Sequence, residues 1–93
     1  MAYMFHIFEY DKSKNTSNKE KHGIDFELSK TIWDDRAAII APTKHIEDEK
    51  RFIIVGKING KIWSVIFTYR KEVIRIISAR RSRKEEIEQY EKN

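Results

Sequence analysis

The chain has 93 residues, 40% of them hydrophobic, with 19 Lys and Arg against 15 Asp and Glu and a net charge of +4. So short a chain buries one core, which predicts a single domain over residues 1–93 and excludes a large enzyme with a deep cofactor cleft. The absence of cysteine excludes disulfide frameworks, thiolate nucleophiles, Cys-based zinc sites and iron–sulfur clusters.

The N-terminal third of the chain predicts one strand and two short helices. Aromatic and apolar residues alternate from Tyr3 to Tyr10, which is typical of a strand. Asp11 is suited to cap a polar helix that ends at Gly23, where glycine tolerates a left-handed backbone. Because this helix has almost no apolar face, we expect it to be held by a thin contact stripe or to be short and mobile. Asp25 then caps a short amphipathic helix with apolar residues Phe26, Leu28, Ile32 and Trp33.

The rest of the chain predicts four strands and a last helix. Pro42 and the charged residues 44–50 indicate a loop after the first of these strands. Asn59-Gly60 favours a two-residue hairpin turn between the second and third strands, and residues 70–72 form a turn before the fourth. Ser82-x-x-Glu85 indicates a capping box at the start of a C-terminal helix. The predicted strands are Ala37 to Ala41, Phe52 to Val55, Ile62 to Tyr69 and Val73 to Ala79.

This order of elements, β-α-α-β-β-β-β-α, predicts an α+β fold. Four consecutive strands with short connections favour an antiparallel meander sheet, partly covered by two N-terminal helices and one C-terminal helix. One face of the sheet is then left partly exposed to solvent, and a ligand would bind there. No apolar run, including Ala37 to Ala41, approaches the roughly 18 residues of a membrane span, and no export signal is visible, so we expect a soluble, cytoplasmic protein.

A basic cluster follows the last predicted strand, because residues 75–84 carry several cations and no acid. Arginine makes bidentate contacts with phosphate and a helix N-terminus adds N–H donors, so the cluster is a candidate phosphate clamp. Arg80 is the strongest candidate, because the end of a strand is held more rigidly than a helix surface. Alternatively, the cluster faces the acidic run at residues 47–49 or is a solvated surface. Its members are Arg75, Arg80, Arg81, Arg83 and Lys84.

A second basic set lies on the first predicted helix, where a solvated helix surface is the simpler interpretation. His22 can carry a proton near neutral pH, or it can interact with the C-terminal carbonyls of its helix. His6, His22 and His45 are scattered without metal-ligand spacing, so we expect neither a metal nor a cofactor. The members of the second set are Lys12, Lys14, Lys19, Lys21 and His22.

Aromatic side chains could stack unpaired bases, although core packing is the simpler interpretation for most of them. Trp63 shares its predicted strand face with Val65, Phe67 and Tyr69, an apolar row that favours packing against helices. Tyr90 lies in the highly charged terminal helix, where packing on the sheet is the simpler interpretation. The other candidates are Tyr10 and Trp33.

Four short motifs occur in order along nearly the whole chain. They are Phe8-Glu9-Tyr10-Asp11, Asn18-x-x-Lys21-His22-Gly23-Ile24-x-Phe26, Glu49-x-Arg51-Phe52-x-x-x-Gly56, and Arg75-Ile76-Ile77-Ser78-Ala79-Arg80 followed by Glu85 or Glu86 and Tyr90. Together they resemble the BrnT family of toxins from bacterial type II toxin–antitoxin modules, in which Trp is common at the position of Tyr10. The resemblance implies a RelE-like fold, a ribonuclease activity that arrests translation, and a cognate BrnA-like antitoxin. The toxin–antitoxin complex is then expected to bind operator DNA through the antitoxin and to repress its own operon.

The implied activity is metal-independent RNA cleavage, which needs a base for the 2′-hydroxyl, positive charge beside the phosphorane and an acid for the 5′ oxygen. We assign binding of the scissile phosphate to Arg80 and Arg75, with assistance from Arg51. Proton transfer is assigned to Lys21 or His22. The other predicted site residues are Tyr90, near the reacting groups, and the RNA-binding residues Arg81, Arg83, Lys84 and Lys19.

The proposed use of Arg75 and Arg80 depends on one geometric condition, and two alternative functions remain open. Strict alternation places Arg75 and Arg80 on opposite faces of their strand, so both can serve only if the chain bends around Ser78-Ala79. A non-catalytic nucleic-acid-binding module would use the same basic residues only to hold phosphates. A pure interaction protein would instead present its basic face to an acidic partner and have no affinity for RNA.

Overall fold

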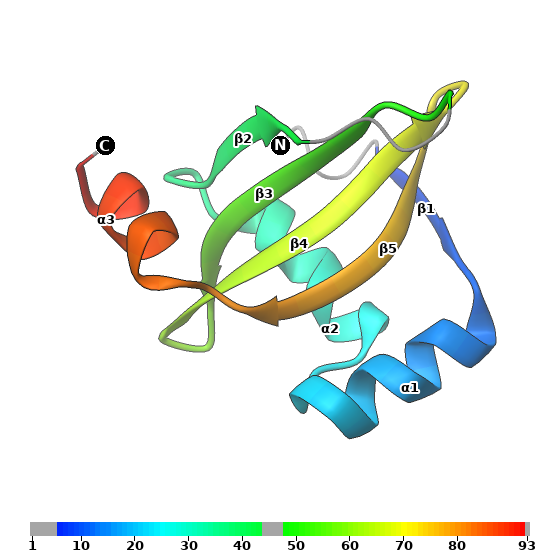
Figure 1. The fold of residues 1–93 in the computed structure, drawn as a ribbon, viewed down its shortest axis with the longest axis horizontal. Coiled ribbons are helices and arrows are strands. Elements are labelled where there is room, and N and C mark those ends of the chain that lie inside the picture. The colour runs from blue at the N-terminus through cyan, green and yellow to red at the C-terminus, as the bar shows by residue number, and fades with distance from the viewer. Residues whose placement is uncertain (1–5, 44–47, 93) are drawn as a thin grey trace.

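The computed structural model describes residues 6–43 and 48–92, which form one five-stranded sheet and its helices (Figure 1). The order of elements agrees with the predicted order, and the α+β fold class is confirmed. Residues 3–5 of the first predicted strand and residues 44–47 of the predicted loop, including His45, lie outside the described residues. The elements are β1 (Ile7–Tyr10), α1 (Lys12–His22), α2 (Phe26–Ser29), the 3₁₀ helix η2 (Lys30–Asp34), β2 (Ile39–Pro42), β3 (Arg51–Ile58), β4 (Lys61–Arg70), β5 (Val73–Arg81) and α3 (Lys84–Lys92).

The strands lie in the order β1-β5-β4-β3-β2. The predicted antiparallel meander is present from β2 to β5, and the hairpin between β3 and β4 turns at Asn59 and Gly60 with φ of 49° and 81°. Strand β1 adds a parallel edge to β5, which makes the sheet mixed. Parallel neighbours need a long crossover connection, and the whole chain from α1 to β4 provides it.

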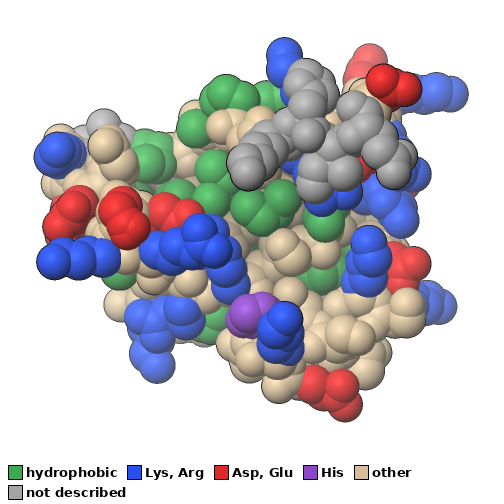
Figure 2. Space-filling view, viewed as in Figure 1, with side chains coloured by type: hydrophobic (Ala, Val, Ile, Leu, Met, Phe, Trp, Pro, Cys, Tyr) green, Lys and Arg blue, Asp and Glu red, His purple; other side chains and the backbone are tan. Residues whose placement is uncertain are grey.

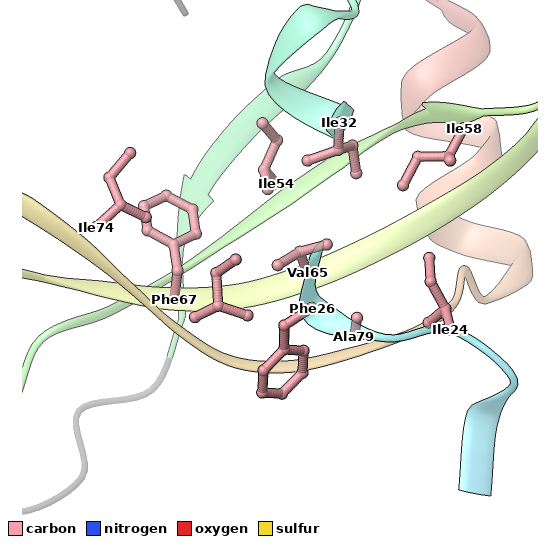
Figure 3. Close-up of a cluster of buried hydrophobic side chains, with 10 residues drawn as sticks. Ile24, Phe26, Ile32, Ile54, Ile58, Val65, Phe67, Ile74 and Ala79 are labelled. Atoms are coloured by element: carbon pink, nitrogen blue, oxygen red, sulfur yellow. The ribbon is translucent and has the colours of Figure 1, made fainter. Parts of the chain in front are cut away.

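The hydrophobic core lies between one face of the sheet and the helices α1, α2 and η2. Phe26 and Ile32 pack from the helices against Val65 and Phe67 of β4, and all four are fully buried (Figure 3). Of the predicted apolar row on β4, Trp63 packs at the margin of the core and Tyr69 is exposed. The other buried core residues are Ile24, Ile54, Ile58, Ile74, Ile76 and Ala79.

Helix α1 is held by amide side chains instead of an apolar stripe. Its predicted caps are present, since Asp11 accepts hydrogen bonds from two backbone N–H groups and Gly23 has a φ of 78°. Asn18 is buried, donates to the carbonyl of Ile24 at 2.9 Å and accepts from the N–H of Ala79 at 3.0 Å. Asn15 accepts from the N–H of Phe26 at 2.7 Å. The expected contact stripe is therefore thin and polar, and it fixes α1 to β5 and α2.

The second predicted helix is one α-helical turn followed by the tighter turn of η2, which packs closely on β3. A Cβ atom at Gly56 would lie 2.8 Å from Cγ1 of Ile32 and 3.1 Å from Cβ of Ala38, so only glycine allows this approach. Asp35 ends η2 and accepts a hydrogen bond from the N–H of Lys57 at 2.7 Å. The Arg-Phe-x-x-x-Gly motif of β3 thus has a packing reason for its glycine.

The predicted capping box of the last helix is wrong by one residue. Strand β5 continues to Arg81 and α3 begins at Lys84, so Glu86 instead of Glu85 reaches back to the N–H of Arg83 at 2.7 Å. The hydroxyl of Ser82 does not cap the helix but bonds the hydroxyl of Ser64 at 2.7 Å. No helix among the described residues is long and apolar enough to cross a bilayer.

Candidate functional site

A β-bulge in β5 brings Arg75 and Arg80 to the same face of the sheet. Ile66 of β4 pairs with Ser78, but the next residue of β4 pairs with Ile76, so Ile77 is inserted without a partner. Arg80 therefore lies opposite Ser64, and Arg75 lies opposite Thr68. Because alternate residues of a strand share a face, Ser64 and Thr68 point to the same side, and so do the two arginines. The bend that allows both arginines to share one face is therefore present, one residue before Ser78-Ala79.

This face is opposite the core and also carries Arg51, which lies across β3 from Thr68. Two rows of side chains cross it. The first contains Arg75, Thr68 and Arg51, and the second contains Arg80 and Ser64. The rows are about 13 Å apart along β4 at the usual rise of a strand. Figure 2 shows hydrophobic side chains in the middle of the molecule in this view, with basic side chains on both sides of them.

Each of the three arginines is paired with a carboxylate. Arg75 Nη1 lies 2.9 Å from Glu9 Oε2, and Arg51 Nε lies 3.2 Å from Glu49 Oε1. Glu49 also pairs with Arg70 at 3.4 Å. Arg75 and Arg80 therefore do not face the acidic run at residues 47–49, because their carboxylate partners lie on β1 and α3.

Arg80 makes the closest of these pairs, through two parallel hydrogen bonds to Glu86. Its Nη1 and Nη2 atoms each lie 2.8 Å from one carboxylate oxygen, and the two side chains are only 21% and 20% exposed. Glu86 also accepts from the hydroxyl of Ser64 at 2.9 Å and from the N–H of Arg83. These contacts, above all those of Arg80, lower the pKa of Glu86 to about 2. The guanidinium is fixed in place, and the side that would bind a phosphate holds a carboxylate.

Tyr90 attaches α3 to the fold at a second point. Its hydroxyl donates to Asp35 Oδ2 at 2.6 Å, and this hydrogen bond raises the pKa of Tyr90 to about 12. Asp35 is itself held by the N–H groups of Lys57 and Ala37. Tyr90 therefore packs on the fold with its hydroxyl bonded to Asp35.

The last turn of α1 lies beside the end of β5. Asn18, one turn before His22, bonds the N–H of Ala79, which directly precedes Arg80. Lys21 is exposed and His22 is half-buried. The helix that carries the two candidates for proton transfer is therefore bonded to β5 at the residue before Arg80.

The predicted RNA-binding residues do not form one surface. Arg81 points to the opposite face from Arg80, and its guanidinium carbon lies 5.3 Å from the centre of the Trp63 ring. Arg83 and Lys84 are exposed around the start of α3. Lys19 lies 3.7 Å from Asp25. Strand alternation separates Arg81 from the other arginines of its cluster.

Sequence reasoning missed the carboxylates that complete this site, Glu9 and Glu86. Glu9 lies 66 positions from Arg75 in the sequence, and only the parallel pairing of β1 with β5 brings the two together. The signal for Glu86 was present, since it lies in the capping segment of the last helix. The described residues contain no group of three or more His, Asp or Glu side chains arranged to hold a metal ion.

Comparison with known proteins identifies one family. The model of a family described as the ribonuclease toxin BrnT of type II toxin–antitoxin systems matches residues 10–86. This match covers the chain from the end of β1 to the first turn of α3, including the three paired arginines. No curated protein matches the chain.

Proposed function

Because the chain belongs to the BrnT family of ribonuclease toxins from type II toxin–antitoxin systems, we propose that it is a metal-independent endoribonuclease. It cleaves RNA by attack of a 2′-hydroxyl on the adjacent phosphate, and this cleavage arrests translation in the cytoplasm. A cognate antitoxin neutralises it, and the complex of the two binds operator DNA through the antitoxin.

The β-bulge at Ile77 is the observation that supports this proposal, because it places Arg75 and Arg80 on one face with Arg51. A preorganised guanidinium stabilises the negative charge that develops on a phosphorane. The separation of the two rows by about 13 Å divides their roles. We assign the scissile phosphate to Arg80, and a phosphate further along the same strand to Arg75 and Arg51.

The end of α1 supplies the groups for proton transfer in this mechanism. Lys21 or His22 takes the proton of the 2′-hydroxyl as the oxygen attacks phosphorus, and the 5′ oxygen leaves with a proton from the other group or from water. The products are a 2′,3′-cyclic phosphate and a free 5′-hydroxyl. Lys19, Arg83 and Lys84 contact the flanking RNA, and Tyr90 holds α3 beside the site.

The test is incubation of the purified chain with RNA in the presence of EDTA. Fragments that end in 2′,3′-cyclic phosphate support the proposal. Salt-sensitive RNA binding without products would instead support a non-catalytic binding module. In such a module, the three arginines that are paired with carboxylates here would only hold phosphates. Absence of both binding and cleavage would leave only protein interaction.

A further inference from the structure

The carboxylate of Glu86 occupies a site that is built for an anion. Three donors converge on it from β4, β5 and the start of α3: the guanidinium of Arg80, the hydroxyl of Ser64 and the N–H of Arg83. Ser64 is fully buried. We call these three donors the anion site.

The donors of the anion site also suit a phosphate. The parallel hydrogen bonds of an arginine fork match two phosphate oxygens as well as they match a carboxylate. The serine hydroxyl and the backbone N–H then supply donors for a further oxygen. Glu86 is ionised at any physiological pH, so it competes with a phosphate for this site at all times.

Helix α3 is attached to the rest of the chain by few contacts. None of its residues is fully buried, in contrast to α1 and α2. Its polar attachments are those of Glu86 at the anion site and of Tyr90 to Asp35. Beneath the helix a hollow of about 210 Å³ lies against apolar side chains of β2 and β3, namely Ile39, Ala41, Ile53 and Val55. Because the apolar contact beneath α3 is incompletely filled, the position of the helix depends mainly on these two polar attachments.

From this geometry we propose that α3 closes the anion site in the free chain, and that an RNA phosphodiester binds Arg80 by displacing Glu86. The proposal rests on the proposed ribonuclease function for the identity of the anion. Glu86 then acts as an internal competitor that keeps the arginine ordered but unavailable until a polyanion is present. A strand of RNA provides this exchange because its other phosphates are held by Arg75 and Arg51 while one displaces the carboxylate.

The first test measures binding with two probes, inorganic phosphate and a 2′-O-methyl RNA oligonucleotide, which lacks the attacking hydroxyl. We expect Glu86→Gln to bind both probes on the order of tenfold more tightly, because apparent affinity falls with the fraction of chains in which a site is closed. Glu85→Gln is the matched control, since it removes the same charge from the neighbouring exposed residue. The gain should disappear in the Arg80→Ala/Glu86→Gln double variant. Equal affinities of the Glu86→Gln and Glu85→Gln chains would overturn the proposal.

A second test does not depend on the folding of the Glu86 variant. Tyr90→Phe removes the other polar attachment of α3 and leaves the anion site intact, so it should also tighten binding of both probes. In the unmodified chain, hydrogen exchange of the amides of residues 84–92 should become faster when the 2′-O-methyl RNA binds. Unchanged affinity in Tyr90→Phe, or slower exchange of α3 in the complex, would show that the helix is not displaced.

The outcome can be separated from that of the ribonuclease proposal. Tighter binding by Glu86→Gln without any cleavage of natural RNA would establish the anion site and contradict the enzyme. Cleavage of RNA together with unchanged affinity of Glu86→Gln would establish the enzyme and contradict the role of α3.

Discussion

At the scale of single residues, the chemistry of this protein depends on what its arginines contact. Glu86 orders the side chain of Arg80, because two parallel hydrogen bonds fix the plane of its guanidinium. A surface arginine without a partner lacks this order. Arg75 and Arg51 have one carboxylate contact each and are comparably shielded from solvent. The proposed mechanism therefore depends more on Arg80 than on the other two.

We predict that Arg80→Ala lowers the rate of RNA cleavage by roughly 10² to 10³-fold, the usual cost of one preorganised charge stabiliser. Arg36→Ala is the matched control, because Arg36 is an exposed arginine between η2 and β2, outside the proposed site. Cleavage is measured on a fixed RNA in EDTA, and growth arrest on induction in bacteria provides a second measurement. Thermal unfolding establishes that both variants are folded. A folded Arg80→Ala chain with full cleavage activity would refute the assignment.

The titration of Glu86 gives a prediction on the pH dependence of stability. Its pKa is about 2 in the folded chain against an ordinary value of 4.5, so its ionised form stabilises the fold above about pH 4.5. This stabilisation is lost as the pH falls toward 2. The urea midpoint should therefore fall between about pH 5 and about pH 2.5, and the fall should be smaller in Glu86→Gln. An equal fall in the two chains would show that Glu86 does not contribute.

At the scale of elements, local chemistry made several features predictable. Asp11 and Gly23 bound α1 as the sequence indicated, and Asn59-Gly60 turns with positive φ at both residues. These features depend on residues a few positions apart, so the sequence carries them. The bulge at Ile77 has no such local signal, because isoleucine is an ordinary strand residue and the insertion is defined only by pairing with β4.

The attachment of α1 shows the same limit. The sequence indicated a polar helix with little to hold it, but not that Asn18 would meet the free N–H of Ala79. That N–H is available because the pairing of β1 with β5 ends at Ile76, so the edge of β5 is open beyond it. Likewise, the positions of Arg75 and Arg80 could be predicted as candidates, whereas Glu9, the partner of Arg75, required the complete topology.

We predict that Asn18→Ala lowers the free energy of unfolding by about 2 to 6 kcal/mol. The substitution leaves two buried backbone groups without a partner, the carbonyl of Ile24 and the N–H of Ala79, at about 1 to 3 kcal/mol each. Urea denaturation measures the change. Lys14→Ala, on the exposed surface of the same helix, should change stability by no more than about 0.5 kcal/mol. If the two variants proved equally stable, α1 would be held by contacts other than the Asn18 amide.

At the scale of the whole molecule, the net charge of +4 is a weak guide to RNA binding. On the face opposite the core, the positive charge of each arginine is neutralised by a nearby carboxylate, from Glu9, Glu49 or Glu86. A strand of RNA can bind these arginines only by displacing carboxylates of the same chain, so part of the binding free energy is lost in breaking the existing ion pairs. Affinity for RNA should accordingly be modest and should depend strongly on salt.

The salt dependence measures how many phosphates the face holds. For single-stranded nucleic acid the slope of log K against log salt concentration is about −0.7 for each phosphate contact. If Arg75 binds a second phosphate of the strand held at Arg80, Arg75→Ala should make this slope shallower by about 0.7 for a 2′-O-methyl RNA. Glu9→Gln, which frees Arg75 from its 2.9 Å partner, should tighten binding and leave the slope unchanged. Arg36→Ala should alter neither quantity. A slope that is the same in Arg75→Ala and in the unmodified chain would restrict RNA binding to the row of Arg80, and the bulge at Ile77 would then serve the fold alone.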